Sequence, residues 1–280
     1  MKMMLCLLAL ALTMATAPAA AAPSNEPAMP AIAQDIVSAG KLRAQSQRLA
    51  KLWLQAGLGI QAGTATGQLA RGTAQFDAAL AHLKPYATQP TTRRDYARVT
   101  ELWLEYRIVL ALPYNDSNTQ TVSYLADDLM LATGRLATRI ESEAEGGSGR
   151  LLDLSMRQNM LAQRLARLYL LAQAGDRSSG RLVDIDQARK EFATTMRELN
   201  DAHENTPASR EALNLAAMQW MFFDRAISEM KKGNAADSRP QHVATASERI
   251  TEVLDAVGQQ YAPDAGNLRF VAATTSMRRN

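Results

Sequence analysis

The sequence has a single cysteine, Cys6, and few aromatic residues. One thiol excludes an intramolecular disulfide, a cysteine redox pair and a cysteine metal site. Aromatic residues make up 5% of the chain, and runs of β-branched residues are scarce. Ala, Leu, Gln, Arg, Glu and Met dominate instead. Because these residues favour helix, we expect an all-α fold.

The chain also lacks a strong excess of one charge, with 31 basic residues against 28 acidic ones. Such a balance gives no electrostatic reason to expect nucleic acid or an anionic membrane surface as a partner. No apolar run approaches the roughly 20 residues that span a bilayer. The longest, residues 3–14, follows Lys2 and precedes an Ala-rich stretch, which is the pattern of a secretory signal peptide. We expect residues 1–22 to be removed, leaving a periplasmic chain without a membrane span.

No residue pattern typical of an enzyme or of a cofactor site is found. His82, His203 and His242 each stand alone near an expected helix end, without a partner at metal-ligand spacing. The sequence has no C-x-x-C-H haem attachment motif, no glycine-rich phosphate loop and no nucleophile elbow. We therefore expect no catalytic residues, no metal site and no cofactor.

The most informative feature is a stretch that recurs 116 positions later. Residues 39–54 read AGKLRAQSQRLAKLWL, and residues 155–170 read SMRQNMLAQRLARLYL. Six positions are identical in the two copies, with Gln47, Arg48, Leu49, Ala50, Leu52 and Leu54 recurring as Gln163, Arg164, Leu165, Ala166, Leu168 and Leu170. A repeat in one register indicates duplication of a whole folding unit.

The rest of the chain fits two such units. Apolar periodicity and breaks at Gly, Pro and Asn predict helices over 31–60, 64–83, about 93–112 and a segment from Val122 to Ile140, then over 151–174, 182–203, 208–232 and 243–261. The glycine stretch at 145–149 separates the sets. We expect two tandem antiparallel four-helix bundles, residues 31–145 and 150–262, forming a pseudo-dimer. Proline-rich residues 23–30 are expected to be a disordered leader and 263–280 a flexible tail.

The first predicted helix carries two neighbouring stripes that avoid full charge, so we expect it to pack on two sides at once. Small residues at Ala39, Gly40 and Ala162 would let the two motif helices approach closely. The sequence therefore predicts direct packing of helix 31–60 against helix 151–174.

The first motif copy fits the pattern A-G-x-x-R-M-x-S-Q-R-x-A-K at Ala39, Gly40, Arg43, Ser46, Gln47, Arg48, Ala50 and Lys51. It resembles the P-box that opens the periplasmic sensor domain of NarX-type nitrate/nitrite sensor kinases and of the PilJ-type chemotaxis transducer. Ala44 replaces the methionine of the pattern. The second copy keeps Met160, Gln163, Arg164 and Ala166 but has Asn159 where the family arginine would stand.

In that family two P-box helices meet across a dimer axis, and the central arginine of each holds nitrate. The resemblance implies that Arg43 contacts the anion and that Gly40 permits close approach. The ligand-binding residues it implies are Gly40, Arg43, Ser46, Gln47, Asn159 and Gln163. Since both copies lie on one polypeptide, we expect Arg43 to face Asn159, with a homodimer through two copies of Arg43 as the alternative. Independently of the resemblance, the planar guanidinium fork suits nitrate or carboxylate.

The resemblance thus implies a periplasmic sensor module for a small anion such as nitrate or nitrite. Because the sequence shows no transmembrane helix, HAMP linker, kinase or methyl-accepting region, we expect it to act through a partner, such as a membrane sensor kinase or a chemotaxis transducer. The alternative is a structural or interaction bundle of the cell envelope without a small-molecule ligand.

Under the structural alternative the same residues have packing roles. Arg43 would form an interhelical ion pair, and Gln47 and Gln163 would hydrogen-bond across the pair of motif helices. Arg48 and Arg164 would brace the bundle against acids, for which the candidates are Glu101, Asp127 and Asp128. Trp53, Trp103 and Trp220 are expected in the core.

Overall fold

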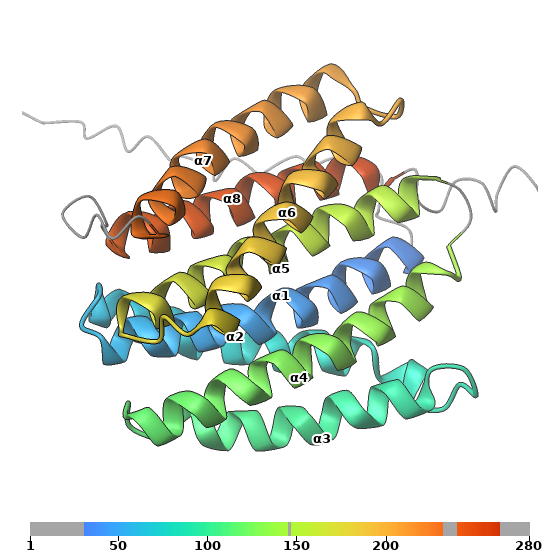
Figure 1. The fold of residues 1–280 in the computed structure, drawn as a ribbon. Helices are drawn as coiled ribbons and strands as arrows, with labels where there is room; N and C mark the ends of the chain where they lie inside the picture. The colour runs from blue at the N-terminus through green and yellow to red at the C-terminus, as the bar shows by residue number, and fades with distance from the viewer. Residues whose placement is uncertain (1–30, 145–146, 232–239, 264–280) are drawn as a thin grey trace, which may run out of the picture.

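The computed structural model describes residues 31–144, 147–231 and 240–263, and the elements within these ranges are all helical (Figure 1). In chain order they are α1 (Ala31–Gly57), α2 (Ala62–His82), the 3-10 helix η1 (Lys84–Ala87), α3 (Arg93–Leu110), α4 (Asp116–Glu141), α5 (Gly147–Gln173), α6 (Ser179–Asp201), α7 (Pro207–Lys231) and α8 (Pro240–Tyr261). The all-α prediction is confirmed. The expected signal peptide, the leader and all but the start of the expected tail lie outside the described residues.

Each predicted helix has a counterpart in the structure, and the differences lie at the ends. α1 stops at Gly57 because the chain then turns through two residues of positive φ, Gly59 at 72° and Gln61 at 50°. α4 begins after Asn115, whose side chain caps the helix by accepting a hydrogen bond from the backbone N–H of Asn118 at 2.8 Å. α5 begins at Gly147, inside the glycine stretch that was expected to break the helical pattern.

α1 and α5 lie side by side and run in the same direction through the middle of the molecule (Figure 1). α1 also packs against α2 and α4, and α5 also packs against α6 and α8. The outer helices α3 and α7 pack mainly against α4 and α8, respectively. The predicted packing of the two motif helices against each other is confirmed, as is the packing of α1 on more than one side. In the described ranges we find no helix long and apolar enough to cross a membrane.

α1 and α5 are in close contact at Gly40. A Cβ atom built on Gly40 would lie 2.4 Å from the Cβ of Met156 on α5. No side chain fits at that separation, so the position requires glycine as long as the two helices stay at this distance. Met156 is the counterpart of Gly40 in the repeat, and the two copies of the motif therefore touch at the same position.

Aromatic side chains form similar clusters on the two sides of the α1–α5 pair. Phe76 stacks on Trp103 with 3.8 Å between ring centroids, and Phe192 stacks on Trp220 with 4.1 Å. Trp53 and Trp103 are buried as expected. Trp220 is only partly buried, because α7 is covered mainly by α8.

We predict that Gly40→Ala lowers the free energy of unfolding by about 1–3 kcal/mol, as overpacking of a close contact does. Gly67→Ala is the matched control, since a Cβ there meets only the end of the Arg71 side chain at 3.6 Å. That control should raise stability by about 0.5–1 kcal/mol, because alanine loses less backbone entropy in a helix. Urea unfolding of both variants checks this, and equal effects of the two substitutions would contradict the close contact.

Candidate functional site

Three of the expected ligand-binding residues lie inside the helix packing. Gly40 contacts Met156, and the Ser46 hydroxyl donates to the carbonyl of Arg43 at 2.7 Å within α1. Gln47 is fully buried, donating to the carbonyl of Ala126 on α4 at 2.9 Å. Its side-chain oxygen accepts from Nε of Arg167 on α5 at 2.8 Å, so the predicted hydrogen bond of Gln47 across the helix pair is confirmed.

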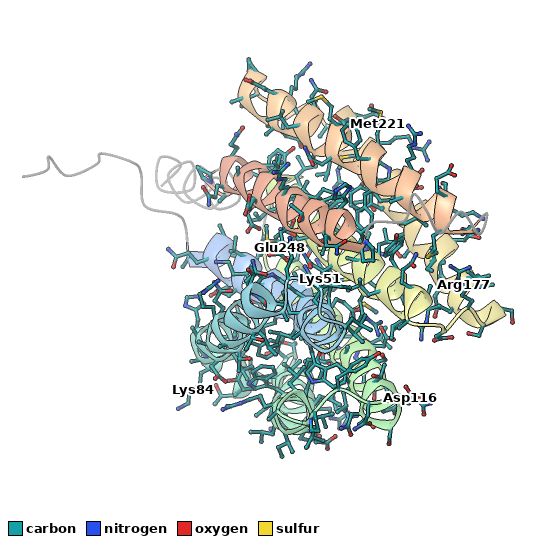
Figure 2. All side chains as sticks on the ribbon, turned by 90° about the vertical axis from the view of Figure 1, so that its left-hand side faces the viewer. Lys51, Lys84, Asp116, Arg177, Met221 and Glu248 are labelled. Atoms are coloured by element: carbon teal, nitrogen blue, oxygen red, sulfur yellow. The ribbon has the colours of Figure 1, made fainter. Side chains whose placement is uncertain are left out.

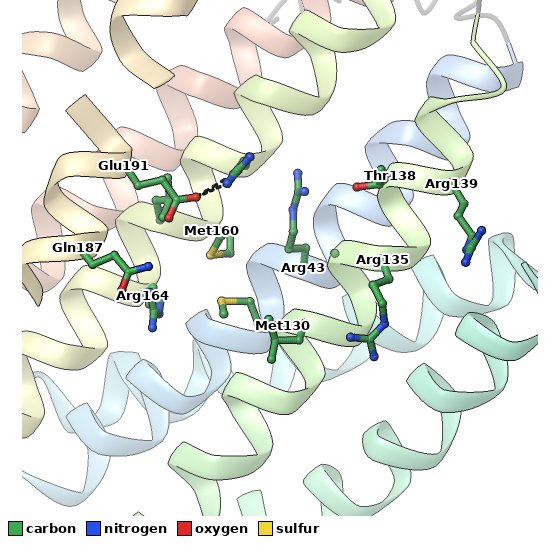
Figure 3. Close-up of a pocket in the computed structure, with 13 residues that line it drawn as sticks. Arg43, Met130, Arg135, Thr138, Arg139, Met160, Arg164, Gln187 and Glu191 are labelled. Atoms are coloured by element: carbon green, nitrogen blue, oxygen red, sulfur yellow. Dashed lines mark hydrogen bonds and ion pairs between the residues drawn. The ribbon is translucent and has the colours of Figure 1, made fainter. Parts of the chain in front are cut away.

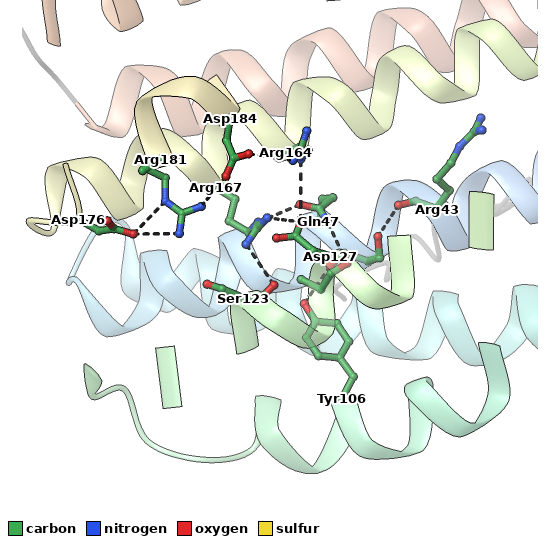
Figure 4. A network of polar contacts seen from close by, with 12 residues as sticks. Arg43, Gln47, Tyr106, Ser123, Asp127, Arg164, Arg167, Asp176, Arg181 and Asp184 are labelled. Carbon is green, nitrogen blue, oxygen red and sulfur yellow. Dashed lines mark hydrogen bonds and ion pairs between the residues drawn. The ribbon is translucent and has the colours of Figure 1, made fainter. Parts of the chain in front are cut away.

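Two fully buried cations extend from the central helices into the opposite half of the molecule. Arg167 of α5 donates to Asp127 of α4 at 2.5 Å (Figure 4). Lys51 of α1 donates to Glu248 of α8 at 2.5 Å, and Figure 2 shows both side chains between these helices. Lys51 and Arg167 occupy the same position in the two copies of the motif. Because a buried cation costs free energy unless it is paired, these contacts bind the two halves to each other.

The preceding arginine of each copy lies beside the same acid. Arg48 donates to Glu248 through Nη2 at 2.6 Å and Nε at 3.0 Å. Arg164 lies 3.9 Å from Asp127 and 3.9 Å from Asp184. Asp127 was among the acids expected to brace these arginines, and for Arg164 it is the right one. For Arg48 the expected acids were wrong, because the partner comes from α8 rather than from the first bundle.

The charges around Glu248 support one another. Burial alone would raise the pKa of Glu248, but Lys51 and Arg48 hold it down to about 2. Burial lowers the pKa of Lys51 to about 8, although Glu248 opposes that shift. The carboxylate and the ammonium are therefore both charged at neutral pH.

The first cleft lies between α1, α4, α5 and α6 and has a volume of about 660 Å³ (Figure 3). Its charged side chains are five arginines and one glutamate, and methionine and leucine side chains cover part of its wall. The lining residues are Arg43, Met130, Leu131, Gly134, Arg135, Thr138, Arg139, Arg157, Met160, Leu161, Arg164, Gln187 and Glu191. Figure 3 shows Arg43, Arg135 and Arg164 around Met130 and Met160.

Arg43 combines an ion pair with an unused hydrogen-bond donor. Its Nη2 donates to the side chain of Asp153 at 2.8 Å and to the carbonyl of Asp153 at 3.1 Å. This is the interhelical ion pair expected under the structural alternative. The Arg43 side chain is only 7% exposed, yet its Nε has no hydrogen-bond partner, and the same holds for Nε of Arg164. Two buried N–H groups in one cleft are groups that an anion would satisfy.

The second cleft, of about 570 Å³, lies between α1, α2, α5 and α8. It is lined by Ser38, Lys41, Ala44, Gln45, Arg48, Gln75, Ala78, Ala79, His82, Met156, Asn159, Gln163, Glu248, Thr251, Glu252 and Asp255. Asn159 donates to Asp255 at 2.5 Å, and burial raises the pKa of that carboxyl. Gln163 donates to the carbonyl of Ser247 and the hydroxyl of Thr251, so it bonds to α8 and not across the motif helices.

Arg43 and Asn159 are thus not brought to one site, because Arg43 lines the first cleft and Asn159 lines the second. Sequence reasoning also missed three further arginines of the first cleft. Arg157 lies two residues before Asn159 in the second motif copy. Arg135 and Arg139 are four residues apart on α4, which places them on one helix face, and that spacing was the available signal.

We predict that Glu248→Gln destabilises the protein by about 3–5 kcal/mol at pH 7, because it leaves the buried Lys51 without its counterion. The carboxyl has a lower pKa in the folded state than in the unfolded state, so its contribution is present above pH 4.5 and is lost as the pH falls towards 2. The difference between wild type and variant should shrink over that range. Urea unfolding from pH 7 to pH 2.5 measures it, and a difference independent of pH would contradict the role of Glu248. Glu101→Gln, in an exposed pair with Arg98, should cost no more than about 1 kcal/mol.

The ion pair of Arg43 generates a second prediction. Arg43→Ala should lower the free energy of unfolding by about 1–3 kcal/mol, since Asp153 loses its charged partner and is only 17% exposed. Removing both partners in Arg43→Ala/Asp153→Ala should recover much of that loss. Thermal unfolding of the wild type, both single variants and the double variant checks this cycle, and strictly additive effects would argue against a coupled pair.

Comparison with known proteins bears on the first half of the chain. Residues 31–127 match the sequence profile of the PilJ family, described as type IV pili methyl-accepting chemotaxis transducer N-term. The match covers α1 to α3 and the first part of α4, and so includes the motif that carries Arg43. No curated protein and no solved structure matches the chain. Residues 31–127 are therefore a PilJ family domain.

Proposed function

We propose that this chain is a periplasmic sensor module that binds a small anion in the first cleft and acts through a partner protein. The PilJ match supports the sensory part, since the family is described by a chemotaxis transducer domain. The signal-peptide pattern of residues 1–22 supports export. The partner would be a membrane sensor kinase or a chemotaxis transducer that responds to the ligand-dependent conformation.

The observation that carries the anion site is the pair of unsatisfied guanidinium N–H groups of Arg43 and Arg164 in one arginine-rich cleft. A buried donor without an acceptor costs about 1–3 kcal/mol, and an anion that accepts from both would remove that cost. Nitrate, nitrite and carboxylates have planar oxygens that match the guanidinium fork. Of these, a carboxylate with an apolar part would also contact Met130 and Met160.

The position of the first cleft suggests how anion binding would change the conformation that a partner protein recognises. Its walls come from α1 and α4 of the first half and from α5 and α6 of the second. An anion held by Arg43 of α1 and Arg164 of α5 would join the two halves at their central contact. It would therefore favour one spacing of the α1–α5 pair over others, and a ligand acts as a signal through such a differential affinity.

We also propose that the two halves arose by duplication, so that α1 and α5 stand where the motif helices of two chains would meet in a dimer. The repeated motif, the contact of Gly40 with Met156 and the stacked aromatic pairs support this. The reciprocal ion pairs of Lys51 and Arg167 support it as well. The contact between motif helices is then internal to one chain and needs no homodimer.

The competing function is a structural bundle without a ligand, and particular contacts favour it. The Arg43–Asp153 ion pair and the fully buried Gln47 show that parts of the motif serve packing. A variant that tests anion binding should therefore replace a cleft residue that has little role in packing. Arg164 is suitable because its ion pairs are long, at 3.9 Å.

We predict that the purified protein binds nitrate, nitrite or a short carboxylate such as acetate or propionate, and that Arg164→Gln weakens this binding at least about tenfold. That factor is the size expected for losing one hydrogen bond to a charged group. Isothermal titration calorimetry with each anion measures the affinity. Thermal unfolding without ligand should be nearly unchanged, because Arg164 makes only long ion pairs.

The matched control is Arg94→Gln, which removes an exposed arginine of α3 that lines neither cleft. It should leave anion binding as in the wild type. If the wild type binds none of these anions, or if both variants behave alike, the structural bundle becomes the better account.

A further inference from the structure

The second cleft contains buried hydrogen-bond acceptors that nothing in the described structure satisfies. The side-chain oxygens of Gln45, Asn159 and Gln163 have no hydrogen-bond partner, and all three residues line this cleft. The three side chains are at least nine-tenths buried, with exposures of 9%, 1% and 0%. Buried acceptors of this kind are normally paired, so three in one cleft suggest a missing donor.

The orientation of two of these amides is fixed by their neighbours. The amide nitrogen of Gln163 donates to the carbonyl of Ser247 at 3.1 Å. Because a carbonyl can only accept, the nitrogen and not the oxygen of the Gln163 amide must face it. The amide nitrogen of Asn159 donates to Oδ1 of Asp255 at 2.5 Å. The remaining oxygens of both residues are therefore acceptors, whichever way Gln45 is turned.

Charge in the second cleft favours a cation. Glu248 is already paired with Lys51 and Arg48. Glu252 and Asp255, one turn apart on α8, then face only Lys41 among the remaining lysines and arginines that line the cleft. His82, the only histidine of the lining, already contacts Asp35 at 2.9 Å. Not counting His82, the lining itself has Lys41 and Arg48 against Glu248, Glu252 and Asp255, a balance of one negative charge. Lys51, which pairs with Glu248, is not part of the lining.

Comparison with the first cleft shows how far the two have diverged. The clefts occupy corresponding places beside the α1–α5 pair, and their motif positions correspond through the repeat. Arg43 of the first cleft corresponds to Asn159 of the second, and Leu161 corresponds to Gln45. At the position of Arg43 and Asn159 the unsatisfied donor of the first cleft is replaced by an unsatisfied acceptor in the second, whereas Arg164 corresponds to Arg48, which is paired with Glu248.

We propose that the second cleft binds a small organic ammonium ion. A primary ammonium group has three N–H donors, which would be shared between the amide oxygens of Asn159 and Gln163 and the carboxylate of Asp255. The carboxylate of Glu252, which also lines the cleft, would be the second charged partner of the ammonium. The apolar part of the ligand would lie against Met156 and Ala44, which also line the cleft. Within the described residues no three His, Cys, Asp or Glu side chains are grouped as metal ligands, which fits an organic cation. This site does not depend on anion binding in the first cleft.

The test is calorimetric titration of the purified protein with methylammonium, ethanolamine and 1,4-diaminobutane, with tetramethylammonium as a cation that has no N–H donor. We expect saturable binding of at least one primary amine and none of tetramethylammonium. Glu252→Gln should weaken the amine at least about tenfold, the effect of losing a charged partner. Because Glu252 is exposed, this variant should fold and melt like the wild type.

Glu211→Gln is the matched control, since it removes one exposed carboxylate of α7 that lines neither cleft. It should leave amine binding unchanged. The proposal is overturned if no primary amine binds, if tetramethylammonium binds as well as the primary amines, or if Glu252→Gln and Glu211→Gln have the same effect. Arg164→Gln should leave amine binding intact, so failure of the anion site and failure of this site are distinguishable.

Discussion

The structure depends on the parallel contact between α1 and α5. Parallel helices can approach this closely only where one side chain is missing, and Gly40 meets that condition opposite Met156. The contact is then fixed by the buried cations Lys51 and Arg167, each of which pairs with an acid on the last helix of the other half. Buried ion pairs contribute little stability compared with apolar packing, but an unpaired buried charge is expensive. Alternative registers of α1 against α5 would strand these charges, so the pairs specify one arrangement.

This arrangement also creates the two clefts. α1 and α5 pack on each other, and each also packs mainly against two further helices, α2 and α4 for α1 and α6 and α8 for α5 (Figure 1). One cleft beside the pair is bounded by α4 and α6, and the other by α2 and α8. Residues of the motif that face the partner helix are committed to packing, as Gln47 is. Arg43 lines one cleft, and Asn159 and Gln163 line the other. The same motif therefore supplies both structural and candidate binding residues.

Helix positions and the central packing were predictable from the sequence, because apolar periodicity and glycine or proline breaks are local signals. The close approach of α1 and α5 also followed from the sequence, since the small residues lay on the low-charge stripe of a repeated helix. The partner of Arg48 was not predictable, because Glu248 lies 200 positions away and is brought near only by the packing of α8. The expectation that Arg43 faces Asn159 was wrong for the same reason, because the packing of the helices, which the sequence does not show, places the two residues in separate clefts. The equivalent residues Arg43 and Asn159 lie in different clefts beside the parallel pair, whereas the equivalent residues Gly40 and Met156 touch each other.

Placing both clefts beside one helix pair has a consequence for any ligand. At the proposed anion site, an anion between Arg43 and Arg164 would draw α1 and α5 together on one side, and the other side shares the same two helices. If the spacing of the pair changes at one cleft, the walls of the other move with it, because both clefts are walled by α1 and α5, which pack directly on each other. Coupling between two ligand sites is reciprocal, so whatever an anion does to affinity at the second cleft, a ligand at the second cleft must do to the anion. Under the two proposals, the difference between Arg43 and its counterpart Asn159 would give one helix contact two chemically different inputs.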